Sequence, residues 1–139
     1  MSGWLLDTNV LIDLIFANAP RLDERYAEEM QAETPMYVSS VSLFEFRFGA
    51  EQSRRRAFQL QSLERFLAAA TVIEFDAQDA QVAALVKIEL AARGTPIGPY
   101  DLLIAAQARA RSLAVATGNA REFSRVAGLA VEDWTASPT

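Results

Sequence analysis

Residues 4–13 read Trp-Leu-Leu-Asp-Thr-Asn-Val-Leu-Ile-Asp, and this stretch decides the fold. The apolar run Trp4–Leu6 has the length of a short buried strand, and it stops at the carboxylate of Asp7. Apolar residues resume at Val10 with helical spacing, so Asp7 lies where a strand is followed by a helix. Ligands of open α/β sheets bind at such strand ends, which makes Asp7 a candidate for chemistry. The simpler alternative is that Asp7 only caps the helix.

The composition indicates one globular domain. The chain has 139 residues, of which 51% are hydrophobic, enough for a core of ordinary size, and we expect residues 1–139 to form a single domain. Cysteine is absent, so there is no disulfide framework. Neither a leader-like segment nor a membrane-length apolar run is evident. We therefore expect a soluble, cytoplasmic protein.

The absence of histidine narrows the possible chemistry further. It excludes histidine acid/base catalysis, nucleophiles activated by histidine, and zinc sites built from cysteine and histidine. Catalysis would have to rest on carboxylates, Lys, Arg, Tyr, Ser or Thr, or on a metal held by oxygen. Oxygen-only ligation favours hard cations such as Mg²⁺ and Mn²⁺.

The net charge of −5 argues against a general nucleic-acid binder, whose affinity depends on a basic surface. It does not exclude one local site. Twelve of the thirteen basic residues are arginine, and Arg54, Arg55 and Arg56 are consecutive. The forked guanidinium suits phosphate, although three charges in a row are more simply a solvated helix face.

Strand-like and helix-like segments alternate along the chain, which predicts an α/β fold. Strands are expected at residues 4–6, 36–38, 113–117 and 129–134, and residues 71–75 should form a strand or an extended connection. Helices are expected at about residues 10–16, 23–32, 41–50, 54–70 and 77–92, and from residue 99 onward. Gly49 should lie near the turn before the fourth helix, and residues 136–139 should be frayed.

Three further polar positions follow strands or open helices. Glu45 lies just past the second strand, although Ser42 and Glu45 also match a capping box. Asp101 falls in the first turn of a helix begun by Pro99, where the helix dipole alone would favour an acid. Asn119 follows the strand at 113–117, and a helix cap explains it equally well.

The shared location of these residues is harder to explain by capping. In a parallel α/β sheet, the ends of strands and the starts of the next helices gather on one rim. Carboxylates gathered there repel each other and raise each other's pKa unless a cation joins them. A divalent metal would remove the repulsion, and metal-bound water would permit phosphodiester hydrolysis without histidine.

Four blocks of sequence, residues 5–13, 40–49, 97–105 and 116–123, together resemble a PIN domain of the VapC-like toxin type. The resemblance implies a three-layer α/β/α fold with a short, mostly parallel central sheet. It also implies a Mg²⁺- or Mn²⁺-dependent endoribonuclease, usually the homodimeric toxin of a toxin-antitoxin pair. The cognate antitoxin would place a basic side chain among the acids, and the substrate would be a structured RNA of the tRNA or ribosomal RNA class.

The resemblance also assigns roles to residues. The metal ligands would be Asp7, Glu45 and Asp101, and the fourth catalytic position, often Asp in the family, is Asn119 here. The supporting residues would be Thr8 and Asn9 beside the first acid, Thr117 beside Asn119, and Glu122, which would compensate for the neutral Asn119. We expect RNA contacts from Arg47, Arg54, Arg55 and Arg121.

Two other functions stay open at this point. Asp7 could be the nucleophile of a phosphatase, but the second Asp expected two residues later is absent, and the single lysine, Lys87, lies within a helix. Alternatively, the neutral Asn119 would be compatible with a PIN-like binding module that has no catalytic activity.

Overall fold

The centre of the molecule is a parallel sheet, seen in a computed structural model that describes residues 2–136. Its strands are β1 (Trp4–Leu6), β2 (Met36–Ser39), β3 (Thr71–Ile73), β4 (Ala114–Thr117) and β5 (Val131–Asp133). They lie in the order β3-β2-β1-β4-β5, and every neighbouring pair is parallel. The tail at 137–139, for which fraying was expected, lies outside the described residues.

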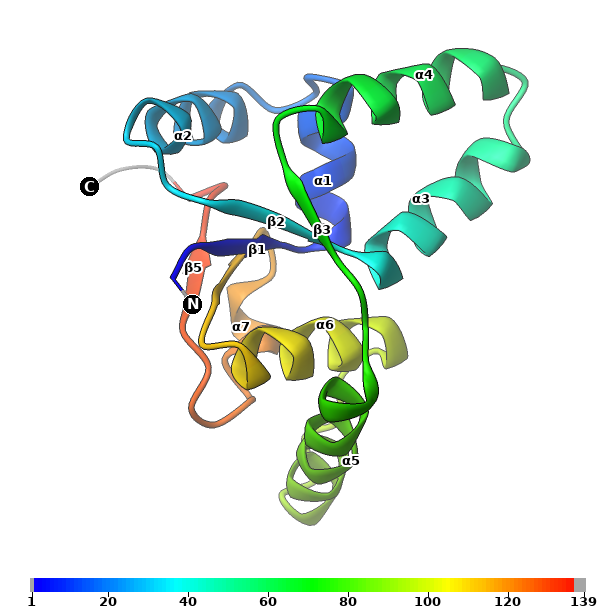
Figure 1. Cartoon of the computed structure of the whole chain (residues 1–139). Coiled ribbons are helices and arrows are strands. Elements are labelled where there is room, and N and C mark those ends of the chain that lie inside the picture. The colour runs from blue at the N-terminus through cyan, green and yellow to red at the C-terminus, as the bar shows by residue number, and fades with distance from the viewer. Residues whose placement is uncertain (1, 137–139) are drawn as a thin grey trace.

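Helices cover both faces of this sheet (Figure 1). They are α1 (Thr8–Ile15), α2 (Pro20–Gln31), α3 (Ser40–Glu51), α4 (Arg56–Leu67), α5 (Ala77–Ala92), α6 (Pro99–Ala110) and α7 (Ala120–Phe123). Helices α1 to α4 lie on one side, and α5 to α7 lie on the other. The predicted three-layer α/β/α architecture is confirmed. Among the described helices, none combines the length and apolarity that crossing a membrane requires.

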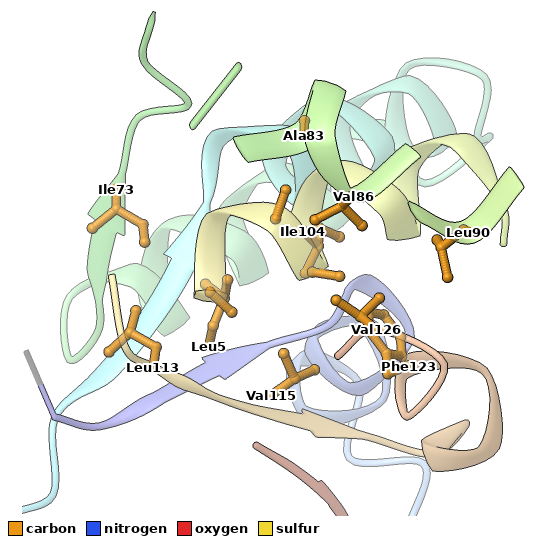
Figure 2. Packing of buried hydrophobic residues seen from close by; sticks show 13 residues of the cluster. Leu5, Ile73, Ala83, Val86, Leu90, Ile104, Leu113, Val115, Phe123 and Val126 are labelled. Atoms are coloured by element: carbon orange, nitrogen blue, oxygen red, sulfur yellow. The ribbon is translucent and has the colours of Figure 1, made fainter. Parts of the chain in front are cut away.

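The apolar run of β1 is continuous because both of its faces are covered. Leu5 points into a core that includes Val115 of β4, Val86 of α5 and Ile104 of α6 (Figure 2). Leu6 points the opposite way, into a core with residues of α1 and α2. Both leucines have no exposed surface, and burying each side chain contributes about 1.5 to 3 kcal/mol. This packing fixes where β1 ends.

Some predicted boundaries are wrong for identifiable reasons. Helix α2 begins at Pro20 rather than residue 23, because proline is well suited to the first helical position, which needs no N–H partner. Gly49, in contrast, lies as expected near the turn before α4, in the last turn of α3. Strand β3 ends at Ile73, and two residues later the backbone N–H of Phe75 donates to the Ser40 hydroxyl instead of a strand. The last strand is restricted to Val131–Asp133.

The strand order reverses beside β1. From β1 the chain moves outward to β2 and β3, then returns to form β4 and β5 on the other side. The order therefore reverses between β1 and β4, and ligands of open α/β sheets bind outside the carboxyl ends of strands at such a point. Asp7 follows β1 and Thr117 ends β4, so both lie at this reversal.

Candidate active site

Asp7 caps α1 and also lies at the point where the strand order reverses. It is buried, with 3% of its surface exposed. Its Oδ1 accepts a hydrogen bond from the backbone N–H of Val10 at 2.8 Å, and its Oδ2 accepts one from the Thr117 hydroxyl at 2.5 Å. Burial raises the pKa of Asp7, the two hydrogen bonds oppose that shift, and the charges of Glu45 and Asp13 add to it.

Glu45 is held by a hydroxyl from α1. The Thr8 hydroxyl donates to Oε1 of Glu45 at 2.6 Å and lies 2.9 Å from the Ser42 hydroxyl. Because Thr8 has one hydroxyl proton and uses it for Glu45, Ser42 is the donor in the second contact. Ser42 is a part of the site that sequence reasoning missed, since its partner lies 34 positions earlier in the chain.

The alternative explanation, that Ser42 and Glu45 form a capping box, is wrong. The N-cap of α3 is Ser39, whose hydroxyl accepts from the backbone N–H of Val41 at 3.0 Å. Ser42 and Glu45 therefore lie within the helix, and their side chains face Thr8. The pattern misled because serines at 39, 40 and 42 all stand around the start of the helix.

Asp101 lies in the first turn of α6, as predicted, after Pro99 and the N-cap Gly98. Its side chain is half-buried. Burial raises the pKa of Asp101 to about 6, helped by the negative charges of Glu122, Asp7 and Glu45, in that order. These four carboxyl groups, here called the acidic rim, are thus close enough to affect one another.

Asn119 and Glu122 bind each other across the start of α7. The side-chain amide of Asn119 donates to Oε2 of Glu122 at 2.6 Å and makes no cap hydrogen bond, so the capping explanation for Asn119 fails. Oε1 of Glu122 accepts from the backbone N–H of Gly98 at 2.8 Å, which draws it toward Asp101. The backbone N–H of Asn119 donates to the Thr117 hydroxyl at 2.8 Å.

No basic side chain neutralises the acidic rim within residues 2–136. The ion pairs found there involve Arg25, Arg56, Arg109 and Arg111, and their partners are other acids. In the same part of the chain, no three acidic side chains already converge closely enough to hold one metal ion. The donors are nevertheless all oxygens, their charges are uncompensated, and the pKa of two of them is raised, a set that suits a hard divalent cation.

The remaining predicted residues lie on the surface. The side chains of Asn9, Arg47 and Arg121 are exposed, and these residues belong to the helices that carry the acidic rim or follow it directly. Arg54 and Arg55 lie beyond the far end of α3, and the Arg55 guanidinium lies 4.2 Å from the centre of the Phe58 ring. Their contacts with RNA stay predictions.

Known sequences place this arrangement in a family. The model of the PIN domain matches residues 4–129. The tRNA(fMet)-specific endonuclease VapC of Shigella flexneri is 38% identical over 135 residues, covering 97% of this chain and 100% of that protein. Ribonuclease VapC2 of Haemophilus influenzae is 34% identical over 134 residues, covering 96% of this chain and 99% of its own length.

Solved structures indicate the same family as the sequence matches. The DNA-bound VapBC of Salmonella typhimurium superimposes with a TM-score of 0.87 at 38% identity, covering 96% of this chain and 99% of the matched one. The VapBC2 of Rickettsia felis, bound to a promoter DNA fragment, gives a TM-score of 0.88 at 28% identity, with the same coverage of both chains. This chain therefore belongs to the PIN-domain family and, within it, to the VapC ribonuclease toxins of toxin-antitoxin pairs.

Proposed function

We propose that this chain hydrolyses RNA phosphodiester bonds with Mg²⁺ or Mn²⁺ held by Asp7, Glu45 and Asp101. The observation that carries the proposal is the acidic rim, where the pKa of Asp101 rises to about 6 among carboxyl groups that no basic residue of the described chain neutralises. PIN domains are generally metal-dependent, which supports the same reading; the choice of Mg²⁺ or Mn²⁺ rests on the oxygen ligands.

When bound, the cation would supply an activated water and offset charge on the reacting phosphate. The protein's own contribution is orientation. Thr117 holds Asp7 through Oδ2, while Thr8 holds Glu45 through Oε1. Residues that hydrogen-bond to metal ligands in this way typically contribute 10- to 100-fold to metal affinity or activity. The N-terminus of α6 favours the ionised form of Asp101, which counteracts part of the repulsion from its neighbours.

Glu122 takes the place that a fourth aspartate would fill. Its two oxygens are occupied by the Gly98 backbone and the Asn119 amide, so its carboxylate is fixed beside Asp101. We infer that Asn119 acts by orienting Glu122 rather than as a direct metal ligand. Before the cation binds, the elevated pKa lets Asp101 hold a proton that binding would release.

The relatives suggest substrate and partner. The Shigella flexneri and Salmonella typhimurium proteins are described as tRNA(fMet)-specific endonucleases, so a tRNA is the substrate class that we propose. Toxins of this family are solved in VapBC complexes, and we propose a cognate antitoxin for this chain. An antitoxin with a basic side chain would neutralise the acidic rim while blocking RNA. We keep the single domain and the homodimer as proposals.

The test is cleavage of a tRNA by the purified chain. Cleavage should require Mg²⁺ or Mn²⁺, stop with EDTA, and be lost in Asp101→Asn. Asp23→Asn is the matched control, because Asp23 also lies in the first turn of a helix, α2, but outside the acidic rim. Cleavage that survives EDTA, or that Asp101→Asn leaves unchanged, would refute the proposal.

A further inference from the structure

Three aromatic side chains project into solvent next to the acidic rim. Phe44 is 53% exposed, Phe48 is 59% exposed and Tyr100 is 43% exposed, whereas Phe46 of the same α3 helix is buried in the core. Exposed side chains of this size that contact one another form an apolar patch, and such patches commonly mark interaction sites. We call these three residues the aromatic patch.

Two residues of the aromatic patch are direct sequence neighbours of acids of the rim. Phe44 directly precedes Glu45 on α3, and Tyr100 directly precedes Asp101 on α6. The ring centres of Phe44 and Tyr100 lie 5.7 Å apart, so the patch bridges the two helices that carry these acids. Phe48 extends it by one helical turn, with its ring stacked 6.3 Å from that of Phe44.

The geometry defines how a planar group could bind. A ring inserted between Phe44 and Tyr100 would need about 7 Å between their centres, twice an ordinary carbon contact, and 5.7 Å is too short. Both side chains are exposed over two-fifths of their surface or more, so a planar group could stack on the patch from outside.

Charge beside the patch favours a nucleotide over an uncharged apolar partner. Arg47 lies on α3 between Phe44 and Phe48, is exposed, and takes part in no ion pair within residues 2–136. Nucleotides combine a planar base, which stacks on aromatic rings, with a phosphate, which Arg47 complements. The acidic rim would repel that phosphate, and Arg47 would offset part of the repulsion.

We propose that the aromatic patch stacks an unpaired base of the RNA adjacent to the phosphate being cut. This rests on the proposed ribonuclease function and adds the form of RNA that the site accepts. Bases inside a duplex are already stacked on one another, whereas bases in loops can turn outward onto aromatic side chains. The site therefore selects loops over paired stems.

The test measures binding with a fluorescent base. One RNA is a stem-loop with 2-aminopurine in the loop, and the other is a matched duplex with 2-aminopurine in a base pair. Every protein in the test also carries Asp7→Asn, which prevents cleavage. Phe44→Leu and Tyr100→Leu should each bind the stem-loop about tenfold more weakly and lose the quenching caused by stacking. Tyr100→Phe, which keeps the ring, and Leu85→Ala, an exposed residue of α5, should match the parent protein. Binding of the duplex should not change.

Equal binding and quenching in the leucine variants would overturn the inference. So would normal RNA binding combined with loss of antitoxin binding, which would assign the patch to the protein partner. Failure of the proposed function would be seen in a different measurement. In that case the chain without these substitutions would cut no RNA in Mg²⁺ or Mn²⁺. If that chain cuts loop RNA and the leucine variants, with Asp7 restored, cut it equally well, only the stacking inference fails.

Discussion

Two clusters of polar side chains in this molecule differ in their charge balance. The first is the acidic rim. The second, between α5 and α6, consists of Asp76, Asp79, Gln107 and Arg111. There, Nη2 of Arg111 lies 2.9 Å from Oδ2 of Asp79 and 3.3 Å from Oδ2 of Asp76. Gln107 adds a 3.2 Å hydrogen bond from its amide to Asp79.

The pKa shifts follow this difference. Asp76 has a lowered pKa, chiefly because the backbone N–H of Asp79 donates to it, with a contribution from the charge of Arg111. Asp101 has a raised pKa because it is buried among other acids. A polar cluster that contains its own cation needs nothing from outside and serves to hold helices together. One that lacks a cation leaves a position for an external charge, which is why we assign the chemistry to the acidic rim.

The largest effect should follow from giving the acidic rim its own cation. Asn119 is exposed and adjoins Glu122, so Asn119→Arg would place a guanidinium there without disturbing the core. That charge would compete with the metal, and we expect RNA cleavage to fall by about a hundredfold or more. Cleavage rates at fixed Mn²⁺ measure the effect, with Asn119→Gln as the uncharged control. Full activity of the arginine variant would show that charge balance does not separate the two clusters.

Removing the cation from the other cluster should affect stability instead. Arg111→Met leaves Asp79, which is 1% exposed, without its ion-pair partner. We expect the free energy of unfolding to fall by about 2 kcal/mol, less than for a fully buried pair because Arg111 is partly exposed. Urea denaturation measures the loss, and Arg121→Met, at an exposed position, should change stability by less than about 0.5 kcal/mol. An unchanged midpoint for Arg111→Met would contradict the structural role.

Loss of an orienting hydroxyl should have an intermediate effect. Thr117→Val removes the hydrogen bond to Oδ2 of Asp7 and the acceptor for the Asn119 backbone. We expect cleavage to fall by about tenfold, with the fold preserved. Thr71→Val is the matched control, because Thr71 is an exposed strand threonine of β3. If both variants cleave at the parental rate, Thr117 does not position Asp7.

The smallest effect is a pH dependence of stability in the metal-free protein. Asp101 has a pKa of about 6 when folded, against an ordinary value of 3.8, so between these values the folded chain binds more protons than the unfolded chain. Its stabilising contribution is complete below pH 3.8 and is lost as the pH rises through 6. We expect the difference in unfolding free energy between the parent and Asp101→Asn to change by about 1 kcal/mol from pH 5 to pH 7 in EDTA, after allowance for solvent exposure. No change in that difference would mean that the pKa of Asp101 is not raised in the folded chain.

The fold was largely predictable because local patterns determine it. The apolar run Trp4–Leu6 is β1 with the predicted boundaries, and the apolar helix after Pro99 is the buried α6. Errors arose where several residues offer the same signal. The second helix was expected to begin at residue 23 although Pro20 begins it, and three serines near the start of α3 offered the same capping signal.

The structure brings the predicted acidic residues to one edge of the sheet, but the contacts between them could not be predicted. Asp7, Glu45 and Asp101 could be chosen because each follows a strand or opens a helix, and the resemblance to PIN domains joined them. The contacts of Thr8 with Ser42 and of Glu122 with Gly98 depend on the packing of α1 against α3 and of α7 against α6. No local pattern in the sequence contains that information, so the contact of Ser42 and the hydrogen bond from Gly98 to Glu122 were not predicted.

Binding of Mn²⁺ tests the central claim most directly. Titration of the metal-free chain, followed by the electron paramagnetic resonance signal of free Mn²⁺, needs neither RNA nor an antitoxin. We predict that the parent protein and Asp76→Asn bind Mn²⁺ at millimolar concentrations or below, and that Asp101→Asn does not. Absence of binding in the parent protein, or equal binding by Asp101→Asn, would contradict the assignment of the acidic rim as the metal site.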